Sequence, residues 1–177
     1  MTSISRRALV LASAALFAAT GATVGATGAQ AADGAQGAKA SPPVPNCQVS
    51  DLHLSIGRVT AGAGSVFVPI QFQNVNPHNC VMRGYPVVVL LDQGKRPITF
   101  PARRSFNRPV TTVTVRTGHK AFATIRTNNQ GFGPRCRPPS SFIRVFPPGA
   151  GGNSALITYR LRVCGMFRVS PVSLTAP

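Results

Sequence analysis

The sequence predicts an all-β domain, and the architecture that fits best is an antiparallel β-sandwich of about eight or nine short strands. Three observations support this. Patterned segments are rich in Val, Ile, Thr and Phe, and turns rich in glycine or proline separate them. No segment shows a sustained 3.6-residue periodicity, which argues against long amphipathic helices. Residues 46–177 are also numerous enough for one core that buries roughly two-thirds of the unfolded surface.

Residues 1–31 have the pattern of a signal peptide. Arg6-Arg7 precedes the alanine-rich run 8–24, and a small-x-small motif predicts cleavage after Ala31. Glycines in and near this run leave it short of the roughly 18 strongly apolar residues that a membrane anchor needs. The paired arginines also resemble a twin-arginine export signal, so the twin-arginine and general secretory routes both stay open. We therefore expect a secreted or extracellular mature chain with no transmembrane span, one that can associate with the cell wall.

Residues 32–45 are rich in glycine, alanine and proline and predict a flexible linker, so the folded domain is expected at 46–177. The run 87–91 is apolar on both faces, as in a strand packed on two sides. Pro69 makes the run 66–73 either an edge strand or a bulged one. The predicted strands are 52–56, 66–73, 87–91, 98–100, 110–115, 121–125, 143–145, 157–163 and 167–169.

Four cysteines lie in the predicted mature chain, and an even number in an exported protein indicates two disulfides. Three connectivities are possible. We favour Cys47–Cys80 together with Cys136–Cys164, because each of these pairs closes one local loop.

A metal site is the competing use of these cysteines, but the chain contains no C-x-x-C pair. His78 and Met82 could form a soft-metal site only if their segment were extended throughout, and the expected disulfide at Cys80 counts against that. Neither a metal nor a cofactor is predicted.

The charge balance is extreme. Lys and Arg number 19 against 3 acidic residues, a formal net charge of +16. Removing Arg6 and Arg7 with the signal peptide leaves 17 basic and 3 acidic residues, a net charge of +14. Such a protein adheres to anionic surfaces, and guanidinium groups suit phosphate-rich partners. Export favours teichoic-type polymers, acidic glycans or anionic lipid headgroups over nucleic acid.

Several arginines are expected to form one continuous cationic surface. Arg160 and Arg162 project from one face of the predicted strand 157–163, with further arginines on neighbouring segments and in the loop 95–108. The competing interpretation is a solvated basic surface with no dedicated ligand. The candidate anion-binding residues are Arg103, Arg104, Arg108, Arg144, Arg160, Arg162 and Arg168.

Catalysis has few candidates. The folded region holds two carboxylates, Asp51 before a strand and Asp92 in a turn, and no G-x-S-x-G motif. The histidines at 53, 78 and 119 fit surface positions. We therefore predict a non-enzymatic module that acts by binding at or near the cell envelope. The alternatives are a secreted enzyme or enzyme inhibitor with its site in the loops 95–108 or 128–139, and a structural subunit of a surface assembly of unknown oligomeric state.

An ordered set of short motifs carries a resemblance to a known family. The motifs are Phe72-Gln73-Asn74 before Cys80, Gly84-Tyr85-Pro86 through Leu90-Leu91-Asp92-x-Gly94, Ile143-x-Val145-x-Pro147-Pro148-Gly149 after Cys136, and Cys164-Gly165 before Val169-Ser170-Pro171-Val172. Together they resemble the secreted actinobacterial DUF4232 family, a domain of unknown function, over about residues 47–172. The resemblance implies an immunoglobulin-like sandwich on an exported or surface-attached protein. It implies no activity and no functional residues.

Overall fold

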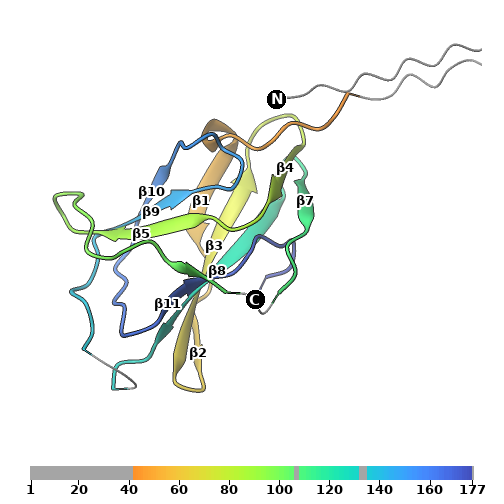
Figure 1. Cartoon of the computed structure of the whole chain (residues 1–177). Helices are drawn as coiled ribbons and strands as arrows, with labels where there is room; N and C mark the ends of the chain where they lie inside the picture. Colours follow the sequence, from red (N-terminus) through yellow and green to blue (C-terminus); the bar gives the residue numbers. More distant parts are fainter. Residues whose placement is uncertain (1–41, 106–107, 132–134, 177) are drawn as a thin grey trace, which may run out of the picture. The chain divides into compact units, whose positions relative to one another are not determined.

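The computed structural model describes residues 42–105, 108–131 and 135–176 (Figure 1). The predicted signal peptide and all but the end of the predicted linker lie outside the described residues. All described strands belong to one compact unit, Ser41–Pro177. The elements are η1 Val49–Asp51, β1 Leu52–Ile56, β2 Thr60–Gly62, β3 Ser65–Asn74, β4 Cys80–Arg83, β5 Val87–Leu91, β6 Arg103–Arg104, β7 Thr112–Val115, β8 Lys120–Asn128, β9 Phe142–Phe146, β10 Ala155–Thr158 and β11 Phe167–Val169.

The described strands form three sheets. The largest has the order β1-β3-β8-β11-β6, with β2 also paired to β3. The second has the order β10-β9-β5, and β4 pairs with β7 in the third. Neighbouring strands are antiparallel except β11 and β6, which are parallel. The parallel pair departs from the purely antiparallel sandwich that the sequence predicts.

The sheets share one apolar core. Phe72 on β3 and Ile125 on β8 are fully buried, and they belong to the same cluster as Leu90 on β5 and Val145 on β9. Figure 1 shows β5, β9 and β10 as a layer that crosses the layer of β1, β3 and β8. Two layers joined through alternate inward residues are the arrangement of a sandwich. The predicted all-β fold is confirmed, whereas its immunoglobulin-like topology stays a prediction.

Eight of the nine predicted strands are present, three of them with the predicted ends and five with shifted ends. The exception is 98–100, which runs along β5 as irregular chain. Ile98 N donates to Leu90 O at 2.9 Å, but Leu90 N donates to the Thr99 hydroxyl at 3.1 Å, so a side chain replaces the backbone acceptor. The segment predicted as 157–163 is strand only to Thr158. Three further strands of 2–4 residues, β2, β4 and β6, were not predicted.

Pro69 lies in β3, which is a central strand and not an edge strand. The register pairs Ile70 with Ile56 on β1 and Phe67 with Thr60 on β2, so three residues face two across this interval. Pro69 O accepts from Gly57 N at 2.8 Å, on the side of that bulge. The N–H and C=O of one strand residue point the same way, so the missing proline donor also faces the bulge. The ladder between β3 and β8 is therefore unaffected.

Both predicted disulfides are confirmed. Cys47 bonds Cys80 and Cys136 bonds Cys164. Two disulfides are compatible with an exported protein, since such bonds persist in oxidising compartments. In the part of the chain that the structure describes, no helix has the length and apolar character needed to span a membrane.

Candidate anion-binding groove

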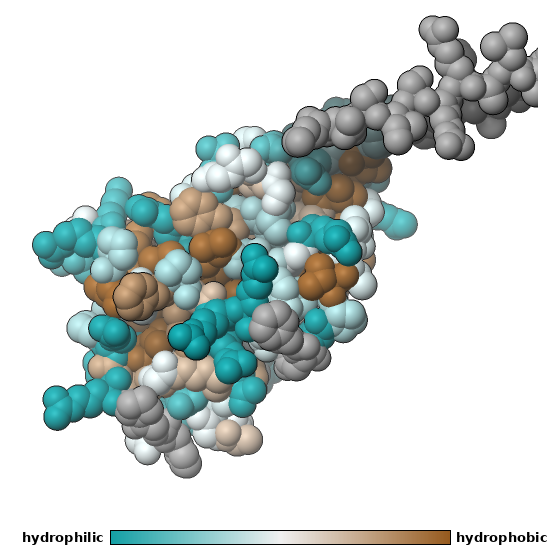
Figure 2. Space-filling model, in the orientation of Figure 1, coloured by the Kyte–Doolittle hydropathy of each residue, from teal (hydrophilic) through white to brown (hydrophobic). Residues whose placement is uncertain are grey.

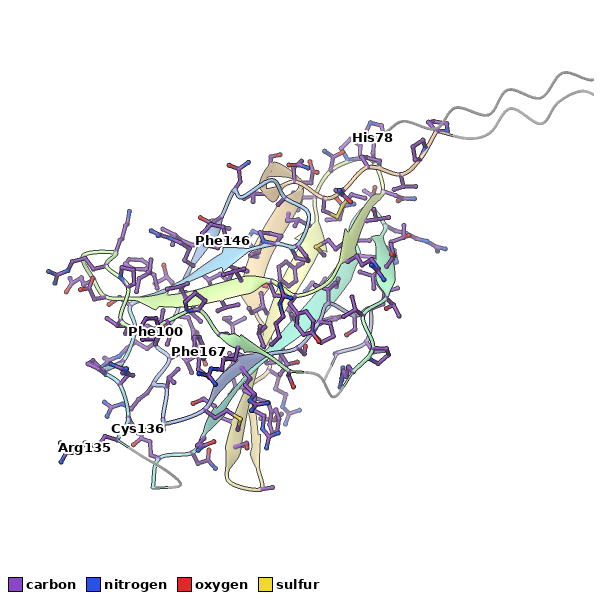
Figure 3. The ribbon with its side chains drawn as sticks, in the orientation of Figure 1. His78, Phe100, Arg135, Cys136, Phe146 and Phe167 are labelled. Carbon is purple, nitrogen blue, oxygen red and sulfur yellow. A yellow bond between two sulfur atoms is a disulfide. The ribbon has the colours of Figure 1, made fainter. Side chains whose placement is uncertain are left out.

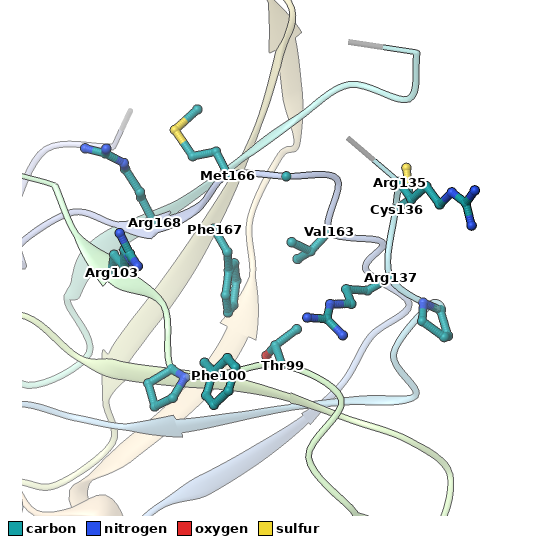
Figure 4. A pocket seen from close by; sticks show the side chains of 13 residues that line it. Thr99, Phe100, Arg103, Arg135, Cys136, Arg137, Val163, Met166, Phe167 and Arg168 are labelled. Atoms are coloured by element: carbon teal, nitrogen blue, oxygen red, sulfur yellow. The ribbon is translucent and has the colours of Figure 1, made fainter. Parts of the chain in front are cut away.

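Three segments that lie far apart in the sequence border one groove of about 980 Å³. They are the chain leading into β6, the chain around Cys136, and the chain leading into β11. Figure 4 shows the groove with its lining side chains, which we call the arginine groove. The lining residues are Thr99, Phe100, Pro101, Arg103, Arg135, Cys136, Arg137, Pro138, Val163, Gly165, Met166, Phe167 and Arg168.

Hydrogen bonds to β5 hold the first of these segments in place. The Thr99 hydroxyl and Ile98 N bond the backbone of Leu90, and Ala102 N donates to Val88 O at 2.8 Å. The chain between these contacts is irregular, and it leaves the ring of Phe100 85% exposed at the groove. The sequence places prolines at 97 and 101 on either side of it, and proline cannot donate to a ladder.

The disulfide Cys136–Cys164 joins the other two segments. Arg137 N donates to Val163 O at 2.7 Å, so the backbone beside the disulfide is bonded as well. Cys164 N donates to the buried hydroxyl oxygen of Thr127 on β8 at 3.0 Å. The groove wall is therefore fixed both covalently and by hydrogen bonds to the large sheet.

Arginines from three neighbouring strands lie side by side, and two of them line the groove. Arg168 on β11 is paired with Arg103 on β6 and with Arg126 on β8. Adjacent strands are about 4.8 Å apart, and like charges directly opposite one another destabilise a sheet. Arg126 is anchored, since its Nε and Nη2 donate to Ser65 Oγ at 3.1 and 3.0 Å and its guanidinium lies 5.5 Å from the Phe67 ring centroid. Arg103 and Arg168 line the groove, and neither has an acidic partner among the described residues.

The two arginines beside Cys136 point in different directions. In Figure 4 the guanidinium of Arg137 is directed toward Thr99 and Phe167, while Arg135 points away from the aromatic side chains. Arg137 therefore faces Arg103 across Phe167. The groove has cationic groups on both sides of its aromatic side chains.

Only part of the predicted cationic surface gathers at this groove. Arg103 and Arg168 line it. Arg104 instead lies over the Tyr85 ring, 5.5 Å from its centroid. Arg144 is on β9, which pairs with β10 and belongs to a different sheet from Arg168. Together with Arg104, four more predicted residues are not among the lining residues: Arg108, Arg144, Arg160 and Arg162.

The expected face with Arg160 and Arg162 also needs correction. Strand β10 ends at Thr158, so both arginines lie beyond it. They remain exposed and alternate with buried Leu161 and Val163. The alternation was therefore predicted correctly, but not the strand. Arg135, Arg137, Phe100 and Phe167 were missed as site residues. The Arg135-Cys136-Arg137 triplet was the available signal, because the favoured disulfide brings it near Arg168.

The described carboxylates are engaged elsewhere. Asp51 Oδ2 accepts from Gln48 N at 2.8 Å and its Oδ1 accepts from Asn76 Nδ2 at 2.8 Å. Asp92 accepts from Arg96 N at 2.8 Å and forms an ion pair with Arg96 Nε at 2.9 Å. The backbone N–H of Arg96 is the main cause that lowers the pKa of Asp92 below its ordinary value of 3.8, with the Arg96 side chain adding to it. Neither carboxylate lines the arginine groove.

The three histidines of the domain lie at exposed positions outside the lining of the arginine groove. His53, His78 and His119 are exposed, and His119 Nδ1 bonds Thr117 O at 3.1 Å. Figure 3 shows His78 at the opposite end of the unit from Cys136 and Phe167. Across the described ranges no group of three or more His, Cys, Asp or Glu side chains is placed to hold a metal ion.

Comparison with known proteins gives one assignment. The family model described as "Domain of unknown function (DUF4232)" matches residues 47–173. The chain belongs to the DUF4232 family. A search of curated proteins finds no match for this family member. The family description names no activity, so the groove has to be interpreted from its own chemistry.

Two solved structures show weak likeness to this DUF4232 protein. A β-glucosidase from Kluyveromyces marxianus is 12% identical with a TM-score of 0.34, and the match covers 67% of this chain and 14% of the enzyme. A β-glucosidase from Listeria innocua in complex with gluconolactone is 13% identical with a TM-score of 0.31, covering 65% and 16%. At these TM-scores the likeness supports no argument about fold or activity.

Proposed function

We propose that this DUF4232 protein is an exported, non-enzymatic β-sandwich module that binds anionic components of the cell envelope through the arginine groove. One observation carries the proposal: Arg103, Arg135, Arg137 and Arg168 line one groove, and no carboxylate of the described residues lines it. The fitting partners are teichoic-type polymers, acidic glycans or anionic lipid headgroups. Each offers phosphate or carboxylate oxygens that a guanidinium bonds with two parallel N–H donors.

The arrangement of the arginines also favours an anionic partner over simple solvation. Arg168 is placed between Arg103 and Arg126 across the sheet, so the free protein carries an unfavourable repulsion. A bound anion lowers that repulsion at the same time as it forms new charge-assisted hydrogen bonds. A cleft lined by one sign of charge also concentrates counterions near its walls.

A charge-matched pair of variants tests the proposal. The groove variant carries Arg103→Gln, Arg137→Gln and Arg168→Gln, and the control variant carries Arg58→Gln, Arg83→Gln and Arg116→Gln, all exposed positions outside the lining. Both lose the same net charge. Exposed charge pairs contribute about 0.2–1 kcal/mol each, so the groove variant should bind a purified cell-wall fraction about tenfold more weakly than wild type. The control should stay within about twofold.

Salt dependence supplies the second readout. Retention of the wild-type protein on the cell-wall fraction should fall steeply as ionic strength rises, because screening shortens the range of these charges. Equal losses in the two charge-matched variants would mean that net charge alone drives retention, and the groove would then have no special part. Retention that salt does not change would contradict the electrostatic basis of the proposal.

The export component has its own test. Mass spectrometry of the protein recovered from culture medium or envelope should find an N-terminus at Ala32. Replacing Arg6 and Arg7 by lysine should abolish export if the twin-arginine route is used and should leave it intact if the general route is used. An intact Met1 on the exported protein would contradict the predicted cleavage.

A further inference from the structure

We infer that the ligand of the arginine groove is an acidic saccharide chain, whose sugar ring stacks on Phe100 and Phe167 while its phosphate or carboxylate groups meet the arginines. The inference rests on the proposed function and names the class of anion. It starts from the aromatic and apolar side chains that line the groove, because attraction of anions does not require them. Figures 3 and 4 both place Phe100 close to Phe167.

The apolar floor is unusual for a site that needs only to attract anions. Phe100 is 85% exposed, the most exposed large apolar side chain among the described residues. Beside it, Phe167 is half-buried and packs against the core with one part of its ring. Val163, Met166 and Pro138 extend the apolar lining. Exposed aromatic groups surrounded by polar residues mark binding sites, because a ligand that covers them removes apolar surface from water, which lowers the free energy.

A sugar ring complements this floor. One face of a pyranose consists of C–H bonds that carry small positive charges, and the face of a phenyl ring is negative. A phenyl ring on the floor of a groove can therefore hold a sugar face by both burial and electrostatics. An inorganic anion, in contrast, gains nothing from Phe100 or Phe167.

The spacing of charge around the rings fits a chain better than a single small ion. Arg103 and Arg168 stand on one side of Phe167 and Arg137 on the other. A polymer that crosses the rings would therefore place an acidic group at each side. The volume of about 980 Å³ lies at the upper end of the range typical of ligand clefts, about 300–1,000 Å³.

Lipid bilayers and single-stranded nucleic acid are two other classes of partner that bind through aromatic and cationic side chains. A bilayer surface is flat, so it would cover exposed Phe100 but would not reach half-buried Phe167 on the floor. Single-stranded nucleic acid also combines stacking with backbone charge. On the visible face in Figure 2, hydrophilic side chains are interspersed with apolar ones. This face therefore has no broad apolar patch that could insert into lipid. The predicted export of the chain favours a saccharide of the envelope over nucleic acid.

The experiment measures binding of the full mature chain to immobilised probes by biolayer interferometry. The probes are polygalacturonate as an acidic saccharide, inorganic polyphosphate as an anion without sugar, an oligo-deoxythymidine, and phosphatidylglycerol vesicles. The variant is Phe100→Ala, which leaves the fold intact because the side chain is exposed. The matched control is Leu174→Ala, an exposed apolar residue outside the groove.

We expect Phe100→Ala to weaken binding to polygalacturonate about tenfold and to change binding to polyphosphate by less than about twofold. The Leu174→Ala control should change neither. This selective loss supports the inference, because only the sugar-bearing probe uses the ring.

Three results would overturn it. If Phe100→Ala changes neither probe while the triple-arginine groove variant weakens both, the groove binds anions of any kind, and the proposed function survives without the saccharide. Tighter binding of oligo-deoxythymidine than of polygalacturonate, lost in Phe100→Ala, assigns the rings to bases. Loss of vesicle binding alone in Phe100→Ala assigns Phe100 to a lipid surface. Failure of the proposed function is recognised separately, by equal effects of the two triple-arginine variants.

Discussion

Cys47–Cys80 and Cys136–Cys164 have similar sequence separations, 33 and 28 residues, but they lie in different surroundings. Cys47 and Cys80 are 0% and 3% exposed and belong to the apolar core. Cys164 is also buried, but Cys136 is partly exposed and lines the arginine groove, and neither belongs to the core cluster. Figure 3 shows Cys136 at one end of the unit and His78, two residues before Cys80, at the other.

The backbone around each disulfide shows the same contrast. Beside the first, Cys47 N donates to Val81 O at 3.0 Å and Val81 N donates to Pro45 O at 2.8 Å, so the start of the domain is tied to β4. The second joins two irregular segments of the groove wall. The chain-entropy model gives each cross-link about 3.5–4 kcal/mol, since the loops are similar in length. Any difference between their effects therefore reports the surroundings and not the loops.

The largest effect is expected from removing the core disulfide. The double variant Cys47→Ala and Cys80→Ala should lower the free energy of unfolding by about 5 kcal/mol, because it loses the cross-link and also leaves small cavities in a packed core. Urea unfolding measures this. A loss no greater than that of the groove disulfide would show that core packing adds nothing to the cross-link.

Removing the groove disulfide should lower the stability less than removing the core disulfide does, but it should weaken ligand binding more. The double variant Cys136→Ala and Cys164→Ala should lower the free energy of unfolding by about 3.5 kcal/mol. Its affinity for polygalacturonate should fall about tenfold, because Arg137 is no longer held opposite Arg103. Both quantities are measured on the same protein preparation, at a temperature where it is folded. Wild-type affinity in this variant would separate the disulfide from the site.

A hydrogen bond from the backbone of Cys164 to Thr127 allows a finer comparison of the surroundings of the two disulfides. Thr127 is buried and its Oγ1 accepts from Cys164 N at 3.0 Å. The variant Thr127→Val keeps the shape and leaves that N–H without its acceptor, so it should lower the free energy of unfolding by about 1.5 kcal/mol. Amide hydrogen exchange at Cys164 should accelerate, while exchange at Cys47 should not change. Equal acceleration at both cysteines would mean that the two ends of the unit open together.

The smallest effect concerns the turn that leads from β5 toward the groove. The pKa of Asp92 is lowered, so its carboxylate stabilises the folded state above the ordinary pKa of 3.8, and that contribution is lost as pH falls through the lower folded value. The variant Asp92→Asn should therefore melt slightly below wild type at pH 6, and the difference should shrink as pH falls below the ordinary value of 3.8 and vanish once the folded carboxyl is protonated. A difference that grows on acidification would contradict this sign.

The residues that were predicted well are those whose neighbours in sequence decide their environment. The apolar run Val87–Leu91 and the alternation Leu52–Ile56 became β5 and β1 with the predicted ends, although β5 is an edge strand with Val87 exposed and is not packed on two sides along its whole length. The pairing of cysteines was also predictable, because short loop closure favours local partners. For such segments, residues that are close in sequence are enough to predict the local structure.

The groove could not be predicted in the same way, because it depends on pairings between distant segments. Arg168 meets Arg103 through a parallel pair of strands 65 positions apart, one of which is two residues long. Nothing in the local sequence indicates that Arg103 lies at the groove whereas Arg104 lies over the Tyr85 ring. Alternation along a short strand sends them to opposite faces, and its register is set by contacts far away.

Pro69 has a consequence for how the chain avoids mispairing. A strand such as β3, which is 10 residues long and buries Val68, Ile70 and Phe72 on one face, could slide along its neighbours by two residues and still bury an apolar face. With Pro69 displaced from the bulge, a carbonyl of β1 would then face a position that has no N–H to donate. The proline thus favours the native alignment of β1 and β2 against β3, in which the position that lacks an N–H lies opposite the bulge.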